Sequence, residues 1–380
     1  MSKSDSRIKA KSIPEASSRR AFLGAAAASA GGAAALAMPR VARAQDMVVF
    51  KFQSTWPQKD IFHEFASDYV ARVNEMAGGR LKLDLLAAGA VAKAFEVQDA
   101  VLAGTLDGGH GVTAYWYGKN KAFSLFGTPP AFGWRANQLL GWVKYGGGQA
   151  LYDELVRDVL QLDLVGFLTG PMPTQPLGWF KEPVESVDAW GGLKYRTVGL
   201  SADLNNELGA AVTIMGGADI VPAMDKGLLD AAEFNNPSSD LVLGFPDVSK
   251  VYMLKSYHQS CECFEVIFNK PKYDALAPEL QAVLKYAAEA ASADMSWKAM
   301  DRYSKDLAAL EERGVAVHTT PDSVLDAQLA AWDKVLASLS GDPFFAKVVE
   351  SQKAWAKRVV AFDLRYEVDQ KKAFDHFFPA

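Results

Sequence analysis

Cysteine is nearly absent from this sequence of 380 residues. The two cysteines, Cys261 and Cys263, stand two positions apart in a strand-like stretch, so their side chains share a face. A disulfide between residues this close in sequence is rarely well shaped. We therefore predict two buried thiols and a fold that does not depend on disulfides.

Histidine is also scarce, and the motifs of common catalytic and nucleotide-binding sites are missing. The five histidines are scattered, without the spacing of a zinc site. Residues 146–149 lack the Gly-Lys-Ser/Thr ending of a phosphate loop, and residues 109–111 follow a helix, whereas a dinucleotide fingerprint opens one. No Gly-x-Ser-x-Gly elbow occurs. These absences favour a binding protein over an enzyme.

Positive charge is in short supply outside the first 44 residues. The whole chain carries a formal charge of −5, and residues 1–44 hold eight Lys or Arg against two Asp or Glu, which leaves −11 for the remainder. Such an acidic chain is a poor partner for nucleic acid or anionic membranes. An anionic ligand would therefore need a local cation.

The basic N-terminal region has the order of an export signal. Residues 18–23 match the twin-arginine pattern through Arg19 and Arg20, an alanine-rich segment follows at 24–38, and residues 41–44 form a small-residue cleavage site. The apolar segment is too short and too rich in alanine for a good membrane anchor. We predict a twin-arginine signal peptide over residues 1–44 and a periplasmic location.

The hydrophobic patterns predict an α/β fold. Residues 48–53 and 80–86 alternate like strands, while residues 62–76 and 95–103 follow helical spacing. This β-α-β-α-β order is typical of a largely parallel sheet. The pattern Ala-x-x-x-Gly-x-Leu-Asp at 100–107 recurs at 223–230, which indicates a second similar lobe with Glu233 in the place of His110. Two such lobes would enclose a cleft at the carboxyl ends of their strands.

Two long helical patterns follow the lobes. Apolar positions after Pro278 predict a helix of about 35 residues, some 50 Å long, which could run across both lobes. A second pattern begins at Asp342, and its stripe through Trp355, Phe362 and Tyr366 is richer in aromatics than a solvated helix needs. The stripe packs either on the chain's own lobes or on a second subunit.

The stretch from residue 170 to residue 236 is the most informative one. A turn-rich segment carries Gln175, a short strand carries Arg196, and Glu233 ends an apolar run. A guanidinium matches a carboxylate with two parallel hydrogen bonds, and a carboxylate among apolar residues needs a partner. Taken alone, these residues favour a structural ion pair between Arg196 and Glu233 over a small anion site.

The spacing of glycine, arginine and glutamate in this stretch resembles the solute-binding proteins of tripartite ATP-independent periplasmic (TRAP) transporters, in their 2-oxo-monocarboxylate-binding branch. The resemblance covers roughly residues 46–378, and the sequences around Arg196 and Glu233 are its specific part. It implies that Arg196 clamps the carboxylate of the ligand. It also implies that Gln175, Glu233 and the backbone carbonyl of Phe234 hold a sodium ion, or a calcium ion, that touches the ligand.

Tyr115, Tyr117 and Gln259 complete the predicted ligand contacts. The aromatic residues at 115–117 either face the cleft and offer a hydroxyl, or pack in the core. Gln259 stands where related chains tend to carry an acid, which would change the preferred ligand because an amide donates as well as accepts hydrogen bonds. The alternative for Gln259 is a polar hinge residue.

We expect a two-lobe periplasmic binding protein fold. The first lobe would span 46–167, completed by 258–275, and the second 168–257, followed by a bracing helix at 276–314 and a C-terminal helical region at 320–380. The resemblance implies a non-enzymatic periplasmic receptor that binds a small 2-oxo or 2-hydroxy acid with a cation and delivers it to membrane permease subunits. It also implies a homodimer with a swapped C-terminal helix. The alternatives are the same fold with a sugar acid, an aromatic acid or a sulfonate, and a periplasmic enzyme that acts on a carboxylate through Glu233.

Overall fold

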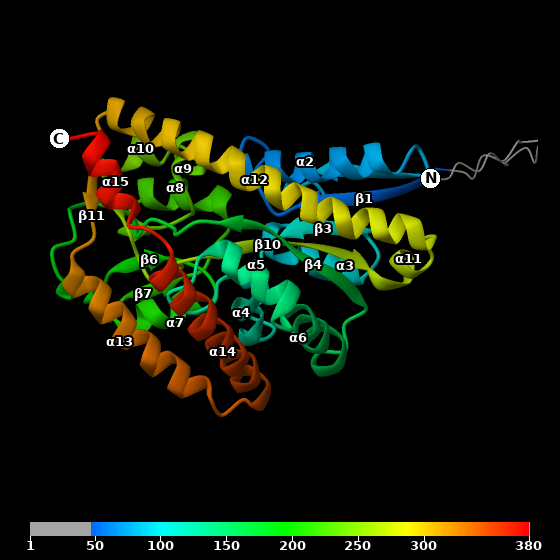
Figure 1. Ribbon diagram of the computed structural model, residues 1–380. Helices are drawn as coiled ribbons and strands as arrows, with labels where there is room; N and C mark the ends of the chain where they lie inside the picture. The colour runs from blue at the N-terminus through cyan, green and yellow to red at the C-terminus, as the bar shows by residue number, and fades with distance from the viewer. Residues whose placement is uncertain (1–46, 380) are drawn as a thin grey trace, which may run out of the picture. The chain divides into compact units, whose positions relative to one another are not determined.

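The computed structural model describes residues 47–379. The signal peptide predicted for residues 1–44 therefore lies outside the described residues. Two β-sheets with helices packed around them form the described part of the chain (Figure 1), which confirms the predicted α/β class. The strand orders are β2-β1-β3-β10-β4 in the first sheet and β11-β9-β5-β8-β6-β7 in the second.

The first sheet mixes parallel and antiparallel pairs. β1 pairs in parallel with β2 and β3, and β10 runs antiparallel between β3 and β4. Because β10 lies inside the sheet, with helices on its faces, all of its residues are buried. The strands are β1 (Val48–Ser54), β2 (Leu81–Leu86), β3 (Gly108–Gly111), β4 (Leu164–Met172) and β10 (Glu262–Asn269).

The second sheet is built from shorter strands. β6 pairs in parallel with β7 and β8, β9 pairs in parallel with β11, and β5 runs antiparallel between β8 and β9. The strands are β5 (Gly178–Phe180), β6 (Lys194–Arg196), β7 (Ala211–Thr213), β8 (Ala231–Ala232), β9 (Val251–Leu254) and β11 (Ala316–Thr319).

Helices connect and cover both sheets. They are α2 (Ile61–Met76), α3 (Val97–Leu102), α4 (Ser124–Gly127), α5 (Ala136–Tyr145), α6 (Gly148–Glu154), α7 (Leu200–Glu207), α8 (Gly217–Asp225), α9 (Pro237–Leu243), α10 (Phe245–Val248), α11 (Lys270–Asp274), α12 (Pro278–Glu312), α13 (Asp322–Leu339), α14 (Pro343–Tyr366) and α15 (Gln370–Phe377). Short 3-10 or π turns lie at Ala94–Glu96, Thr113–Trp116, Lys121–Phe123, Leu155–Val159 and Val187–Trp190. Within residues 47–379, no helix combines the length and apolar character that a membrane span requires.

The two copies of the repeated sequence pattern have the same local structure. Gly104 and Gly227 both take a left-handed conformation, with φ of 72° and 70°, which glycine adopts without a steric penalty. Asp107 then accepts a hydrogen bond from the backbone of β1, and Asp230 accepts one from the backbone of β6. Each copy therefore places the strand that follows it beside its parallel neighbour, β3 beside β1 and β8 beside β6.

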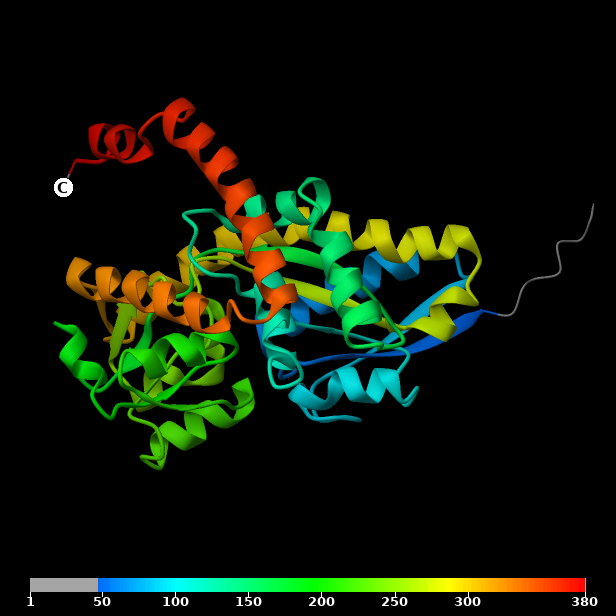
Figure 2. The same ribbon diagram turned by 90° about the horizontal axis from the view of Figure 1, so that it is seen from below.

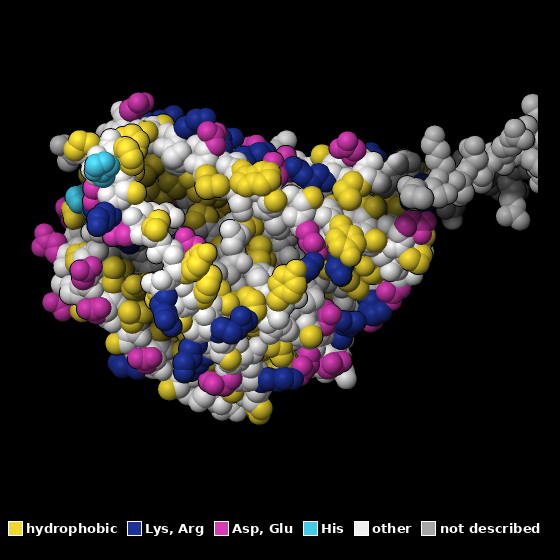
Figure 3. All heavy atoms as spheres, in the orientation of Figure 1, with side chains coloured by type: hydrophobic (Ala, Val, Ile, Leu, Met, Phe, Trp, Pro, Cys, Tyr) yellow, Lys and Arg dark blue, Asp and Glu magenta, His cyan; other side chains and the backbone are white. Residues whose placement is uncertain are grey.

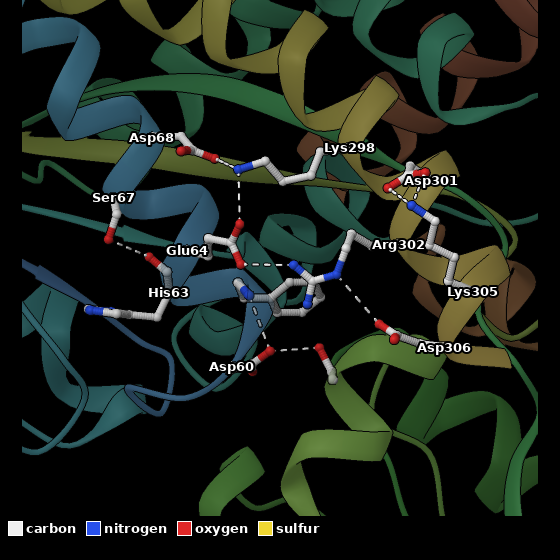
Figure 4. Close-up of polar contacts among 12 residues, drawn as sticks. Asp60, His63, Glu64, Ser67, Asp68, Lys298, Asp301, Arg302, Lys305 and Asp306 are labelled. Atoms are coloured by element: carbon white, nitrogen blue, oxygen red, sulfur yellow. Dashed lines mark hydrogen bonds and ion pairs between the residues drawn. The ribbon is translucent and has the colours of Figure 1, made fainter. Parts of the chain in front are cut away.

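The α12 helix has the 35 residues that the sequence predicts. It packs against α2 beside the first sheet and against α9 beside the second, as Figures 1 and 2 show. Lys298 of α12 bonds to Glu64 and Asp68 of α2, and Arg302 bonds to Glu64 (Figure 4). Because partly exposed ion pairs contribute little, the buried leucine, alanine and methionine side chains of α12 account for most of this packing.

The C-terminal helices divide into a buried half and an exposed half. The first half of α14 buries Phe345, Val348 and Val349. The end of α14 and the whole of α15 stand away from the rest of the described chain in Figure 2. Large apolar side chains are exposed there, at Phe362, Leu364, Tyr366, Val368, Phe374, Phe377 and Phe378.

Candidate functional site

Arg196 and Glu233 come together because their strands are parallel neighbours. Arg196 ends β6, and its register partner in β8 is Ala232, the residue before Glu233. The carboxyl ends of parallel strands lie at the same edge of a sheet, so both side chains emerge there. Arg196 Nη1 lies 3.1 Å from Glu233 Oε1, and both side chains are fully buried. The ion pair that the residues alone predict is therefore present.

The guanidinium of Arg196 is already held by backbone oxygens. Its Nε and Nη2 donate to the carbonyl oxygen of Met215 at 3.0 and 2.8 Å, and its Nη1 donates to the carbonyl oxygen of Glu233 at 2.8 Å. Together with the bond to Glu233 Oε1, these contacts use four of the five N–H groups of an arginine. One N–H of Nη2 is left to meet a ligand.

Two segments cross between the sheets next to this ion pair. One joins β4 to β5 and carries Gln175, and the other joins β9 to β10 and carries Gln259. The backbone N–H of Gln175 donates to the carbonyl oxygen of Gln259 at 3.1 Å, so the segments lie side by side. The side-chain Nε2 of Gln175 donates to Glu262 Oε2 at 2.5 Å.

A small cavity lies between the two sheets at this crossing. Its volume is about 10 Å³, roughly the space of one water molecule. Aromatic and aliphatic side chains form most of its wall, and a few polar groups converge on it, as in small-molecule sites generally. The lining residues are Trp56, Phe62, Val112, Tyr115, Gln175, Arg196, Val198, Phe234, Asn235 and Glu262.

Several buried oxygen atoms at this site have no hydrogen-bond partner within residues 47–379. Among them are Oε1 of Gln175, Oε2 of Glu233 and Oε1 of Gln259. A buried oxygen without a partner is costly, and sodium and calcium are bound by carboxylate, amide and carbonyl oxygens. Burial raises the pKa of Glu233 to about 7, against the opposing effect of Arg196. A cation beside Glu233 would remove that desolvation cost, so these residues fit the predicted metal.

The structure gathers some of the predicted site residues and not others. Tyr115, Gln175, Arg196 and Phe234 line the cavity, and Glu233 lies directly behind Arg196. Tyr117 does not line it: its hydroxyl donates to Asp203 at 2.6 Å, outside the cavity. Gln259 is fully buried beside Gln175 but is also absent from the lining.

Glu262 and Asn235 line the cavity although the sequence did not single them out. The signal for Glu262 was an acid within a strand otherwise rich in Cys, Phe, Val and Ile, where a carboxylate needs a partner. Glu265 carries the same signal, but it bonds to Trp116 and Tyr152 away from the cavity. A register shift between Cys263 and Phe264 lies between the two acids. Only the fold therefore shows which acid faces the cavity.

Residues 52–342 match the bacterial extracellular solute-binding protein family 7. The chain belongs to this family. The resemblance to the TRAP solute-binding proteins is thereby confirmed. The family is one of transport receptors, so the alternative of an enzyme acting through Glu233 is set aside.

Relatives of this solute-binding protein cover nearly the whole of the described chain. A curated relative from Nostoc sp., a monocarboxylate 2-oxoacid-binding periplasmic protein, is 30% identical over 325 residues, which are 84% of this chain and 88% of the relative. The predicted α/β periplasmic binding protein fold class is confirmed by the two sheets and by solved TRAP solute-binding proteins of similar structure.

Two of these structures contain ligands. The TRAP solute-binding protein from Bordetella bronchiseptica, with calcium and picolinate in one site of a mixed-occupancy dimer, is 26% identical and gives a TM-score of 0.81 over 87% of this chain and 97% of its own. The protein from Pseudoalteromonas atlantica, with sodium and pyruvate, is 28% identical and gives a TM-score of 0.80 over 87% and 99%. Sodium and calcium, the two predicted cations, both occur in these relatives.

Proposed function

We propose that this chain binds a small 2-oxo monocarboxylate together with sodium or calcium in the cavity between the two sheets. The observation that carries the proposal is the pair of buried oxygens without partners, Gln175 Oε1 and Glu233 Oε2, beside Arg196. The similar protein from Pseudoalteromonas atlantica holds sodium and pyruvate, and the relative from Nostoc sp. is a monocarboxylate 2-oxoacid-binding protein. The cavity supplies what such a ligand needs, namely a cationic donor, a place for a metal ion and an apolar wall.

Each site residue has a distinct role in this proposal. Arg196 would donate its remaining N–H to the carboxylate of the ligand, and Gln175, Glu233 and the carbonyl oxygen of Phe234 would hold the cation. Arg196 and Glu233 neutralise each other, so the carboxylate of the ligand would otherwise bring an uncompensated negative charge into a buried site. The cation supplies the balancing charge. Ligand and cation should therefore bind with positive and mutual coupling.

The proposal includes delivery to a membrane permease from the periplasm. The first sheet, with strands within 48–172 and 262–269, would act as one lobe, and the second sheet, with strands within 178–254 and 316–319, as the other, closing on the ligand through the two crossing segments. The signal peptide proposed for residues 1–44, with Arg19 and Arg20, would export the chain. The family of transport receptors and the periplasmic relative support this placement.

A homodimer is also part of the proposal. The exposed apolar side chains of α14 and α15 lack cover in a single chain. In Figure 3 hydrophobic side chains surround the hollow below α12 on the same face of the molecule. The dimer of the similar Bordetella protein supports a second copy as the cover.

Small aromatic acids are the second candidate ligands. The Bordetella protein holds picolinate, an aromatic acid whose ring nitrogen stands next to the carboxylate-bearing carbon. Trp56, Phe62, Tyr115 and Phe234 give the cavity of this chain an aromatic wall that such a ring could contact. Sugar acids and sulfonates have no comparable support from this cavity.

Calorimetric titration tests the proposal. Pyruvate, lactate and picolinate are titrated into the protein in choline-based buffer treated with chelator, and then with sodium or calcium added. We expect pyruvate to bind much more tightly with the cation than without it, and to be recovered unchanged. Glu233→Gln should lose most of that cation dependence, because it deletes the charge that holds the ion. Phe234→Ala should retain it, since only the backbone of Phe234 is involved.

Equal pyruvate affinity in all three buffers would show that no cation takes part. Failure of pyruvate and lactate to bind, with tight binding of picolinate, would move the proposal to aromatic acids.

A further inference from the structure

Glu262 occupies an unusual position for a carboxylate. It begins β10 of the first sheet, and only 3% of its surface is exposed. Its Oε2 accepts two amide N–H groups, from Gln175 Nε2 at 2.5 Å and from Asn235 Nδ2 at 2.6 Å. Gln175 lies on the segment that crosses from β4 to β5, and Asn235 follows β8 of the second sheet. Glu262 is therefore the polar link from the first sheet to the residues that would surround the cation.

The bond to Glu262 decides which way the amide of Gln175 faces. A glutamine amide has an N–H₂ end and an oxygen end of nearly equal size, and its partners select the orientation. An acceptor oxygen at this position attracts the N–H₂ end. A flipped amide would instead set its oxygen against the acceptor. The oxygen of Gln175 is thus directed away from Glu262, and that atom is a buried oxygen without a partner within residues 47–379.

Glu262 is itself held from a second direction. Asn235 donates to the same Oε2, and its own oxygen accepts a hydrogen bond from Asn236 Nδ2 at 3.0 Å. The orientation of the Asn235 amide is therefore fixed at both ends. This leaves Glu262 little freedom to follow Gln175 if that side chain turns.

We propose that Glu262 is a positioning residue that orients Gln175 so that its side-chain oxygen is presented to the cation. This inference rests on the proposed function, since it concerns the cation of that site. Partners that orient a metal ligand from behind commonly change metal affinity by about 10- to 100-fold when they are removed. Glu262 acts through Gln175 and needs no contact with the cation or the ligand.

The test is a calcium titration without any carboxylate, using full-length mature protein and three variants. Glu262→Leu removes the acceptor, and calcium affinity should fall about tenfold or more. Glu262→Gln keeps a carbonyl oxygen that can accept both amides, and it should bind calcium nearly as the wild type does. Glu265→Gln is the matched control, a buried acid of the same strand that faces Trp116 and Tyr152, and its calcium affinity should not change.

A double-mutant cycle tests whether Glu262 affects calcium affinity through Gln175. In a Gln175→Met background there is no amide to orient, so adding Glu262→Leu should weaken calcium binding little further. Fully additive losses would overturn the proposal, because Glu262 would then act independently of Gln175. Equal losses in Glu262→Gln and Glu262→Leu would also overturn it, because the carboxyl group of Glu262, and not an acceptor oxygen alone, would then matter.

The outcome separates this proposal from the proposed function. If the wild type binds neither calcium nor pyruvate, the proposed function fails and the positioning role with it. If the wild type binds both, and Glu262→Leu binds calcium equally tightly, only the positioning role fails. Should Glu262→Leu not fold, the comparison of Glu262→Gln with the wild type and with Gln175→Met still decides between charge and orientation.

Discussion

At the scale of single residues, the site combines an ion pair with polar groups that have no partner within residues 47–379. Arg196 is bound to Glu233 and to two backbone carbonyl oxygens, and it retains one donor. Glu233 retains one oxygen without a partner. A bound anion is therefore compatible with the ion pair, because the pair leaves one donor of Arg196 and one oxygen of Glu233 without a partner.

Replacing Arg196 should weaken ligand binding strongly. Arg196→Met leaves Glu233 as an uncompensated buried acid and removes the donor for the ligand, a loss of about 3–5 kcal/mol for a broken buried pair. Pyruvate affinity should fall by about two to four decades. Arg196→Lys should also bind poorly, because an ammonium group cannot reproduce the planar fork.

Calorimetry with pyruvate and calcium measures this effect. Arg72→Met is the control, since Arg72 pairs with Asp294 at a partly exposed site away from the cavity. If an Arg196 variant binds pyruvate as tightly as Arg72→Met does, Arg196 does not take part in ligand binding.

At the scale of elements, the C-terminal helix α15 is exposed, whereas α12 packs against other helices. The α12 helix is fixed along its length by contacts with α2 and α9. By contrast, no residue of α15 is buried. Trp355, farther back in α14, donates to the carbonyl oxygen of Gln138 at 3.0 Å and so belongs to the chain's own packing. The part of α14 up to Trp355 therefore packs on the chain itself, and the exposed apolar surface begins after Trp355.

Removing residues 369–380 should change assembly and leave the fold intact. This deletion takes away α15, which contributes no buried residue, so the thermal midpoint of a single subunit should change little. Sedimentation velocity should show the dimer of the full chain replaced by monomer. Deletion from Trp355 onward is the comparison, and it should also destabilise the fold because it exposes the α5 surface.

The dimer proposal fails at this step if the full-length mature chain sediments as a monomer at micromolar concentration. It also fails in its swapped-helix form if the shortened chain remains fully dimeric.

At the scale of the whole molecule, buried acids are unusually numerous. Burial raises the pKa of Asp60 to about 6, those of Glu233, Asp240 and Glu265 to about 7, and that of Glu262 to about 8. The folded protein therefore binds more protons than the unfolded chain between about pH 4 and pH 8. Burial also lowers the pKa values of His110 and His258 to about 3, which makes the opposite contribution up to about pH 6.5.

The free energy of unfolding of the ligand-free protein should fall between pH 6.5 and pH 8. In this window the two buried histidines lose only their remaining protons in the unfolded chain, which is a smaller opposing contribution, whereas the buried acids of the folded state must ionise. Urea unfolding at several pH values measures the slope. Glu265→Gln should reduce the slope of stability against pH, because an amide can hydrogen-bond to both Trp116 and Tyr152 and does not ionise.

Exposed Glu350 provides the control variant, Glu350→Gln, which should keep the slope of the wild type. A wild-type stability that rises over this window would contradict the assignment of neutral acids to the folded state.

The sequence by itself determined the local structure and the residue types of the site. The repeated pattern fixed two similar turns, because Gly104 and Gly227 adopt a positive φ that other residues resist. Helical spacing fixed the full length of α12. The residue types of Arg196 and Glu233 alone favoured an ion pair, and the spacing of this stretch predicted the family. The turns and the α12 helix depend on hydrogen bonds and side-chain periods within short segments, which the sequence displays directly.

Only the tertiary structure decided which residues share the cavity. Gln175 and Glu262 are 87 positions apart and meet because β10 lies inside the first sheet while the crossing segments run side by side. The same arrangement turns Tyr117 toward Asp203 and away from the cavity, and it separates the role of Glu262 from that of Glu265. Strand order and register set these distances, and they follow from packing across the whole fold rather than from any local pattern.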